Sequence, residues 1–221
     1  MLRQPDPAKD RLKVPASKLF RLAAKTLLHR VHLDVYSPKA GRVVFNPSDK
    51  GNARFSPIRD SARAVIPVIY AGTTGDCALM ESVFHDLPLD MTGVMYDKTK
   101  LDHQVHTQIE TTEELALIDL TAVGLRWFKL QNTDLIDTTA ADYPVTREWG
   151  KALYENNPGV QGLYWTSRLD NRAQSMVLFE RRMGKPDWLK PMGVPQPLVN
   201  GLGDIAADVG ALAEKILVDL G

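Results

Sequence analysis

One stretch, residues 65–85, constrains the fold of this chain more than any other. It begins with a short apolar run, Val65–Tyr70, turns through residues 72–75, and continues with helix-forming residues. A strand that leads directly into a helix places Tyr70 at the strand end and Glu81 about two turns into the helix. Such a unit can form the floor of a catalytic cleft, although it is also ordinary scaffolding. The polar residues elsewhere in the chain decide between the two.

The length and composition favour a folded globule. A chain of 221 residues with 44% hydrophobic and 24% charged residues can bury one sizeable core, and one domain is the default. No apolar run approaches the roughly 20 residues that span a bilayer, and the N-terminus has no apolar leader. We therefore expect a cytoplasmic protein that does not engage a membrane.

The charges and the single cysteine exclude several classes. Lys plus Arg and Asp plus Glu both number 27, so the chain is not a general nucleic-acid-coating protein, and we expect no direct nucleic-acid binding. A lone Cys77 excludes an internal disulfide and any multi-cysteine metal site. At the start of a helix its thiolate can be activated, but a small, semi-buried residue is the expected role.

The first part of the chain is expected to hold an arm, a helix and a long loop. Residues 1–16 are polar and proline-rich, which predicts a flexible N-terminal arm ahead of one domain over residues 17–221. Apolar residues at helical spacing predict a helix from Ser17 to near His29, and alternation predicts a strand over residues 31–36. Residues 37–64 are rich in turn formers and read as a long loop.

The rest of the chain mixes further helices and strands. The helix through Glu81 should end at Pro88 and Asp90. Strands are predicted within 93–109 and at 116–120, 162–166 and 175–179, and helices at 125–130 and 146–154. Residues 184–203 are expected to be irregular, and Asp204–Leu220 reads as an amphipathic helix capped by Asp204. Without steady βαβ alternation, the predicted class is α+β, with a compact mixed sheet and flanking helices.

Common cofactor and metal motifs are absent. The sequence has no P-loop, no G-x-G-x-x-G and no G-x-S-x-G. Two H-x-x-H pairs, His29/His32 and His103/His106, would place their members on opposite faces of a strand. We therefore predict no metal site and no bound cofactor.

What remains is a set of separated polar residues, each of which lies near the end of an expected element. Taken singly, each is more simply explained without a functional role, because arginines are common on solvated surfaces and a helical Glu usually faces water. Glu81 stands out, since the residues around it are apolar, so it is desolvated, paired with a cation, or on the exposed stripe. The five candidates are Arg30, Arg54, Tyr70, Glu81 and Ser167.

An ordered set of short motifs makes this chain resemble the RES domain family, named for an arginine, a glutamate and a serine. The motifs span roughly residues 28–180. They are HRVH with Arg30, GNARFSP with Arg54, VIYAGTTGDCALMESVFH with Tyr70 and Glu81, LALIDLT at Leu115–Thr121, and GLYWTSR with Ser167.

The resemblance implies a function that composition does not. RES proteins are toxins of bacterial toxin–antitoxin pairs, with a fold similar to that of ADP-ribosyltransferase toxins. They cleave the nicotinamide–ribose bond of NAD, as a glycohydrolase or phosphorylase, and their usual partner is an Xre-like helix-turn-helix antitoxin. By motif position, Glu81, Arg30 and Ser167 would be catalytic residues, and Arg54 and Tyr70 would bind substrate.

The residue types suit that chemistry. A guanidinium is a natural partner for the pyrophosphate of NAD where no P-loop exists, and Arg30 and Arg54 fit that role. Loss of nicotinamide leaves oxocarbenium character on the ribose, which a carboxylate such as Glu81 stabilises. Tyr70 can stack on a ring and donate a hydrogen bond, and Ser167 can orient the ribose or the nicotinamide amide.

Other functions remain open at this point. The same site would serve an ADP-ribosyltransferase that modifies a protein, since only the acceptor differs. A non-catalytic partner-binding module, using a basic arm or the last helix, belongs to a different class. An RNA-cleaving toxin is disfavoured by the neutral charge balance. A neighbouring reading frame for a helix-turn-helix protein would support the toxin account.

Overall fold

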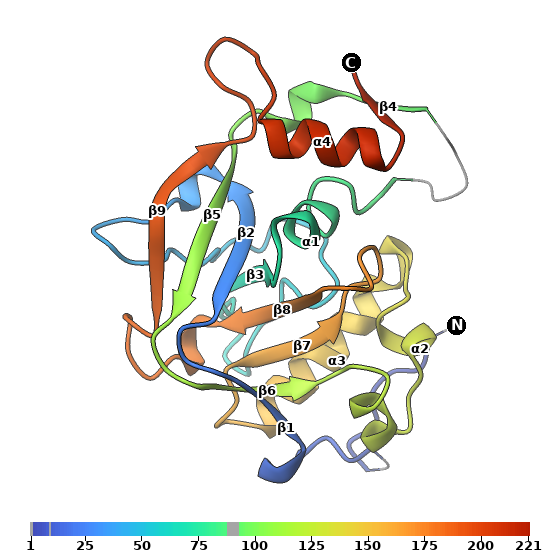
Figure 1. The fold of residues 1–221 in the computed structure, drawn as a ribbon. Helices are drawn as coiled ribbons and strands as arrows, with labels where there is room; N and C mark the ends of the chain where they lie inside the picture. The colour runs from blue at the N-terminus through green and yellow to red at the C-terminus, as the bar shows by residue number, and fades with distance from the viewer. Residues whose placement is uncertain (1, 9, 88–92) are drawn as a thin grey trace.

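The computed structural model describes residues 2–8, 10–87 and 93–221, which form a mixed α+β fold (Figure 1), and the predicted class is confirmed. The described residues build one eight-stranded sheet in the order β1-β6-β7-β8-β3-β2-β5-β9 and a two-stranded sheet of β10 and β4. The strands of the large sheet are β1 Leu19–Leu22, β2 Leu27–Leu33, β3 Val68–Gly72, β5 Gln104–Thr111, β6 Leu115–Asp119, β7 Gly162–Thr166, β8 Gln174–Phe179 and β9 Leu189–Pro197.

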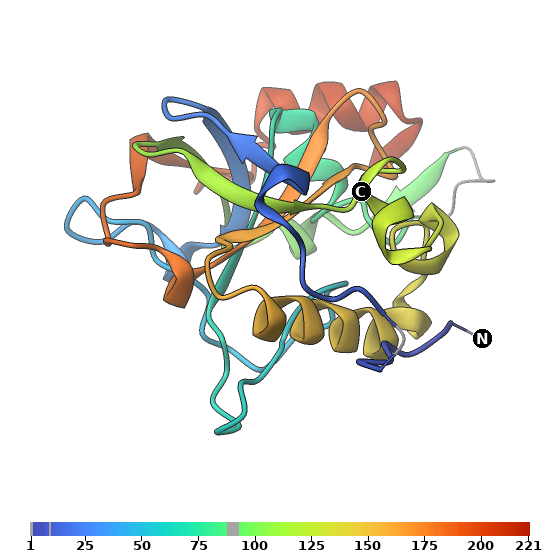
Figure 2. The same ribbon diagram turned by 90° about the horizontal axis from the view of Figure 1, so that it is seen from below.

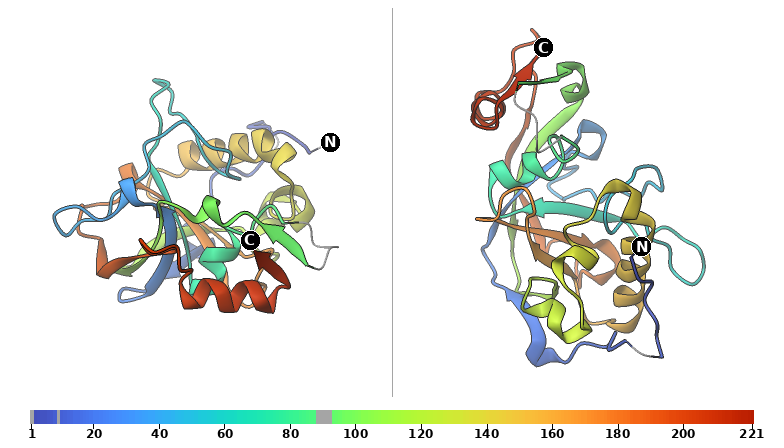
Figure 3. Two further views of the ribbon diagram at one scale, coloured as in Figure 1. Left: turned by 90° about the horizontal axis from the view of Figure 1, so that it is seen from above. Right: turned by 90° about the vertical axis from the view of Figure 1, so that its right-hand side faces the viewer.

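Among the described residues, four α-helices and several 3₁₀ turns surround the sheet. The helices are α1 Gly75–Met80, α2 Asn132–Leu135, α3 Tyr143–Asn156 and α4 Ala207–Lys215. Figure 2 shows α3 lying along one face of the β6–β7–β8 half, whereas α1 and α4 lie beside the β2–β5 half (Figures 1 and 3). No helix among the described residues has the length and apolar character that crossing a membrane needs.

The sheet is curled, and its two halves run at a steep angle to each other in Figure 1. All of its pairings are antiparallel except that of β6 with β7, whose connection contains α2 and α3. Alternate residues of β8 face opposite sides: Val177 and Phe179 join the core under α3, whereas Met176 and Leu178 join the core on the other side. The sheet is therefore covered on both faces where the site lies.

Several predicted elements are confirmed. The opening stretch forms a strand, β3, that leads into a helix, α1. The strands predicted at 116–120, 162–166 and 175–179 correspond to β6, β7 and β8, and the helix at 146–154 lies within α3. Residues 93–109 contain two strands, β4 (Val94–Tyr96) and β5, and the helix at 125–130 is a 3₁₀ helix, Gly124–Phe128.

The helix predicted from Ser17 to His29 is wrong. A 3₁₀ turn, Ala16–Lys18, leads into β1, and a tight turn in which Lys25 has a φ of 63° leads into β2. β1 pairs along its whole length with β6, so sheet pairing with a distant segment overrides the local spacing. Arg30 accordingly lies within a strand and not at a helix end.

The burial of β2 also reverses the predicted pattern. The alternation suggested that Val31 and Leu33 face inward, but Leu28, Arg30 and His32 are the buried residues. Leu33 is exposed. The buried face of this strand therefore carries an arginine and a histidine.

α1 is shorter than predicted. It ends at Met80, and Glu81 is its C-cap residue, so the glutamate does not lie two turns inside the helix. Turns follow up to residue 87. Pro88 and Asp90, the predicted helix end, lie outside the described residues.

The C-terminal segment differs in two ways. Residues 184–203, expected to be irregular, contain β9, which pairs with β5. The predicted helix over Asp204–Leu220 is confined to α4, whose N-cap is Ala206 and not Asp204. Leu217 adopts a left-handed φ of 59° after the helix, and β10 (Val218–Leu220) then pairs in parallel with β4.

The N-terminal arm is held more closely than its composition suggested. Trp149 on α3 donates its indole N–H to the carbonyl of Arg3, and Trp127 donates to that of Arg11. Leu12 is buried, and its carbonyl accepts from the Asn157 amide. Aromatic and amide side chains of the domain thus bind the backbone of the arm.

Candidate active site

Glu81 lies directly after α1 and turns its carboxylate toward two polar partners. Its Oε1 accepts a hydrogen bond from the Ser167 hydroxyl at 2.7 Å, and its Oε2 lies 3.6 Å from Nη1 of Arg54. The Glu81 side chain is 17% exposed. Of the three environments expected for this acid, the structure shows a partly desolvated carboxylate paired with a cation.

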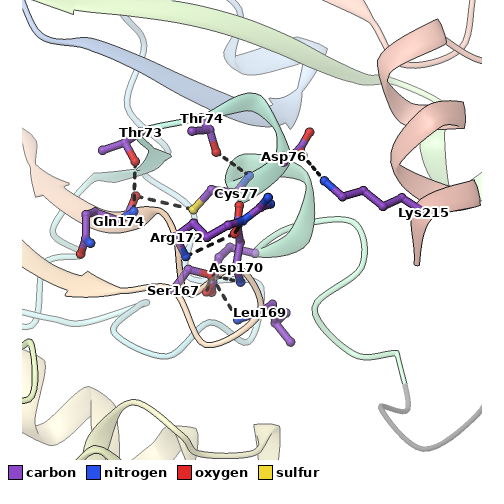
Figure 4. A network of polar contacts seen from close by, with 11 residues as sticks. Thr73, Thr74, Asp76, Cys77, Ser167, Leu169, Asp170, Arg172, Gln174 and Lys215 are labelled. Carbon is purple, nitrogen blue, oxygen red and sulfur yellow. Dashed lines mark hydrogen bonds and ion pairs between the residues drawn. The ribbon is translucent and has the colours of Figure 1, made fainter. Parts of the chain in front are cut away.

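The junction of β3 and α1 fixes the position of Glu81. Thr74 caps α1 by accepting a hydrogen bond from the Cys77 N–H at 3.1 Å (Figure 4). Gly72 ends β3, and a Cβ at this position would lie 2.9 Å from Cys77 Sγ, so the strand and the helix can approach this closely only with glycine here. The apolar strand and the turn residues that follow it therefore fix the position of α1 and of Glu81 at its end.

Ser167 follows β7, where the chain turns back toward β8. Its oxygen accepts hydrogen bonds from the backbone N–H groups of Leu169 at 3.2 Å and Asp170 at 3.0 Å (Figure 4). A hydroxyl has one hydrogen and two lone pairs, and the hydrogen is already given to Glu81. Because the hydrogen-bonding capacity of Ser167 is filled, the serine orients the carboxylate.

Arg54 is buried by residues of α3. It is 5% exposed, its guanidinium lies 5.7 Å from the centroid of the Tyr143 ring, and its backbone carbonyl accepts from the Thr146 hydroxyl. Within the described part of the chain, its Nε is buried without a hydrogen-bond partner. Arg54 thus faces Glu81, and one of its N–H donors, at Nε, is not used in a hydrogen bond with the described residues.

Tyr70 and Trp165 form an aromatic wall next to Glu81. The Tyr70 oxygen accepts the Phe55 N–H at 3.0 Å, and desolvation raises the pKa of this phenol to about 12, so it stays protonated at neutral pH. The rings of Tyr70 and Trp165 meet edge to face, with centroids 6.3 Å apart. The Trp165 indole N–H is buried and has no partner among the described residues.

Arg30 is an unusually buried cation. It is 4% exposed, and its Nη1 donates to the Val44 carbonyl at 2.8 Å. In the described ranges, no carboxylate lies within ion-pair distance of it, and burial lowers the pKa of its guanidinium to about 9. It therefore remains positive at neutral pH without a neutralising partner, which is unusual unless an anion binds there.

Two adjoining hollows lie at this site. A cavity of about 210 Å³ is lined by Arg30, Tyr36, Asn46, Lys50 and Tyr70, among others. A slot of about 30 Å³ is lined by Glu81, Trp165, Ser175 and Tyr70. Tyr70 and Val31 border both, so the carboxylate and the buried cation open onto neighbouring spaces.

The structure brings the five predicted residues into one region, in two groups. Ser167 and Arg54 each contact the Glu81 carboxylate, and Tyr70 contacts the residue after Arg54. Among the described residues, no hydrogen bond or ion pair joins Arg30 to these side chains, and it lines the larger cavity together with Tyr70. Sequence reasoning missed Tyr36, Lys50 and Trp165; only Trp165, two residues before Ser167 within GLYWTSR, had a signal that pointed to it.

The histidines and Cys77 are the remaining candidates for metal-ligating and thiol chemistry. No cluster of three or more His, Cys, Asp or Glu side chains among the described residues is arranged to hold a metal, and the absence of a metal stays a prediction. His29 and His106 instead pair across β2 and β5, with Nδ1 and Nε2 3.0 Å apart. Cys77 is buried more completely than the predicted semi-buried residue, and desolvation raises the pKa of its thiol to about 11, which disfavours an activated thiolate.

The overall fold is shared with a solved toxin–antitoxin structure. The chain matches one in the crystal structure of the M. tuberculosis MbcT–MbcA toxin–antitoxin complex, with a TM-score of 0.57, 15% identity, and coverage of 91% of this chain and 93% of that chain. The family model of the RES domain matches residues 27–189, and this chain therefore belongs to the RES domain family. No curated protein matches it.

Proposed function

We propose that this protein consumes NAD by cleaving the bond between nicotinamide and ribose. One observation carries the proposal: a carboxylate oriented by Ser167 and Arg54 adjoins a cavity in which Arg30 is buried without a counter-charge. A dinucleotide matches both groups, because its anionic pyrophosphate can pair with Arg30 and its ribose, which becomes cationic as the bond breaks, can lie at the Glu81 carboxylate.

Each side chain then has a defined role. Arg30 binds the pyrophosphate, and Glu81 stabilises positive charge on the ribose as nicotinamide departs. Tyr70 borders both hollows and positions the substrate between them. Ser167 acts through Glu81, which differs from the expectation that it orients the ribose or the nicotinamide amide. Arg54 balances the charge of the Glu81 carboxylate and lines neither hollow, which differs from the expectation that it binds the pyrophosphate.

We further propose that the protein is the toxin of a bacterial toxin–antitoxin pair and acts in the cytoplasm. Its family and the likeness to a chain from a toxin–antitoxin complex support this role. Its partner would be an Xre-like helix-turn-helix antitoxin. Co-expression with such a protein from the adjoining reading frame should yield a co-purifying, inactive complex; separate elution and undiminished NAD loss would contradict this.

The Glu81→Gln variant tests the reaction. Glutamine can keep the hydrogen bond from Ser167 but removes the negative charge, so the NAD-consumption rate should fall by about 10²–10³-fold. Glu113→Gln, at an exposed position outside the site, is the matched control and should retain the wild-type rate. Loss of NAD and release of nicotinamide are measured with purified protein, and thermal unfolding confirms that both variants fold.

The products identify the acceptor. Free ADP-ribose indicates water, ADP-ribose 1″-phosphate formed only with added phosphate indicates phosphorolysis, and ADP-ribose bound to protein indicates the alternative transferase. Wild-type protein that leaves NAD intact with and without phosphate would remove the proposal and favour a non-catalytic binding module.

A further inference from the structure

The substrate cavity has a second cation whose position bears on substrate choice. If the reacting ribose lies at Glu81, as the proposed function requires, the rest of the dinucleotide extends past Tyr70 into the larger cavity. Arg30 then meets the pyrophosphate, and the adenosine end lies on the side of the cavity away from the slot. The loop over residues 46–53 forms a wall of the cavity and does not line the slot.

The loop over residues 46–53 is anchored on several sides. Asn46 exchanges two backbone hydrogen bonds with Val68, at 2.9 and 3.1 Å. Arg147 of α3 donates to the Asn52 side chain at 2.8 Å, and the Lys50 N–H donates to the Ser48 hydroxyl at 3.0 Å. The backbone of Lys50 is therefore held in place at the cavity.

The side-chain ammonium of Lys50 makes no hydrogen bond or ion pair within the described ranges of the chain. Lys50 nevertheless lines the cavity. Tyr36 also lines this cavity and offers an aromatic face to a base. A positive charge is thus available at the end of the cavity that the adenosine would occupy.

The same wall presents no carboxylate to the cavity. Among the described residues that line it, none is Asp or Glu, and its charged residues other than histidine are Arg30 and Lys50. The acid of the loop, Asp49, binds Nη2 of Arg59 at 2.5 Å and is not part of the lining. NAD-selective sites commonly use an acidic side chain to bind the ribose 2′-hydroxyl, whereas a basic side chain accommodates a 2′-phosphate.

We propose that this cavity accepts NADP as well as NAD, with Lys50 binding the 2′-phosphate of the adenosine ribose. The reaction at the other ribose is unchanged. The C1′–N bond breaks, its electron pair leaves with neutral nicotinamide, and water adds its oxygen to C1′ and releases a proton. The products from NADP are nicotinamide and 2′-phospho-ADP-ribose; with phosphate as acceptor, a phosphate oxygen takes the place of water.

Two measurements test this specificity. Wild-type protein is assayed for nicotinamide release from NADP and from NAD, and the folded Glu81→Gln variant is used to measure binding of both by calorimetry. Lys50→Glu should lower kcat/KM and affinity for NADP by about tenfold or more relative to the values for NAD, because only NADP carries the 2′-phosphate. Lys39→Glu, an exposed lysine outside the cavity, is the charge-matched control.

The outcomes are distinct for the two proposals. NAD turnover without NADP turnover or binding overturns the specificity assignment and leaves the proposed reaction intact. Equal effects of Lys50→Glu on both dinucleotides, or an equal effect of the Lys39 control, overturn the role of Lys50. Lys50-dependent binding of NADP to a protein that cleaves neither dinucleotide supports the binding assignment and removes the proposed reaction.

Discussion

The burial of Arg30 lowers the stability of the fold. A buried guanidinium without a carboxylate partner costs free energy, because its lost hydration is only partly replaced by the Val44 carbonyl. The pKa of about 9 reflects this cost. Such a residue persists where its charge is used for binding, and the stability cost and the binding gain can be separated experimentally.

Arg30→Met should therefore separate stability from function. Methionine fills a similar elongated space without a charge, so the free energy of unfolding at pH 7 should rise by roughly 1–2 kcal/mol. Binding of NAD, measured by calorimetry, should be lost. Arg42→Met, at an exposed loop arginine, should change the unfolding free energy by less than about 0.5 kcal/mol and keep binding. A destabilised Arg30→Met protein that still binds NAD would contradict this account.

At the scale of residues, the sequence identifies which residues form the site but not the contacts between them. The order of the motifs singles out Glu81, Ser167 and Arg54, and the Glu81 carboxylate contacts the other two. That Ser167 has no remaining hydrogen-bonding capacity depends on the turn after β7, whose backbone N–H groups bind its oxygen, and the residue type alone does not reveal this. The unpaired indole of Trp165 depends on packing against Tyr70 and is invisible in the local sequence.

At the scale of elements, strands buried on both faces were predictable and edge strands were not. β6, β7 and β8 are continuous apolar runs of the kind that buried strands require. β1 is a four-residue edge strand that pairs with β6, far away in sequence. Its apolar residues also fit helical spacing, and only the distant partner decides between the two structures.

The helix that carries Glu81 at its end is stabilised by a C-terminal element. Leu79 and Phe84 share a core cluster with Val209 and Leu212 of α4, outside the segment that matches the RES domain. The Nζ atom of Lys215 in α4 also lies 3.4 Å from Oδ2 of Asp76 in α1. α4 therefore supports the backbone from which the Glu81 carboxylate projects.

Leu212→Ala should lower both stability and activity. Leu212 is 4% exposed, and its truncation leaves a cavity under α1, which costs about 2–4 kcal/mol of unfolding free energy. NAD consumption should fall at temperatures where the protein is still folded, because Glu81 directly follows α1. Lys215→Ala removes only an exposed ion pair and should cost less than about 1 kcal/mol. Equal losses for both variants in urea unfolding would show that α4 does not pack as described.

At the scale of the whole molecule, the curl of the sheet creates the site. Glu81 follows β3 and Ser167 follows β7, and β8 lies between these two strands in the sheet. Arg30 comes from β2, on the other side of β3. An α+β class follows from the mixture of elements, but this strand order does not, because pairing partners far apart in sequence leave no local pattern.

The histidines of β2 and β5 should make the whole fold sensitive to acid. Burial lowers the pKa of His32 to about 4, and it lowers those of His29 and His106 as well. Well above pH 6.5, the ordinary pKa of histidine, these side chains are neutral in both states and do not affect stability. Below it the unfolded chain takes up protons first, so stability falls with pH until the folded protein also protonates.

His32 alone should account for about 2 kcal/mol of unfolding free energy lost between pH 7.5 and pH 5, given a shift from 6.5 to about 4. The His32→Gln variant, measured by urea unfolding at both pH values, should lose about that much less than the wild type. His103→Gln, at an exposed histidine beside Asp34, should follow the wild-type dependence. If His32→Gln and the wild type lose the same free energy, then His32 is not buried as a neutral side chain, and the inverted face of β2 that brings Arg30 into the cavity would be in error.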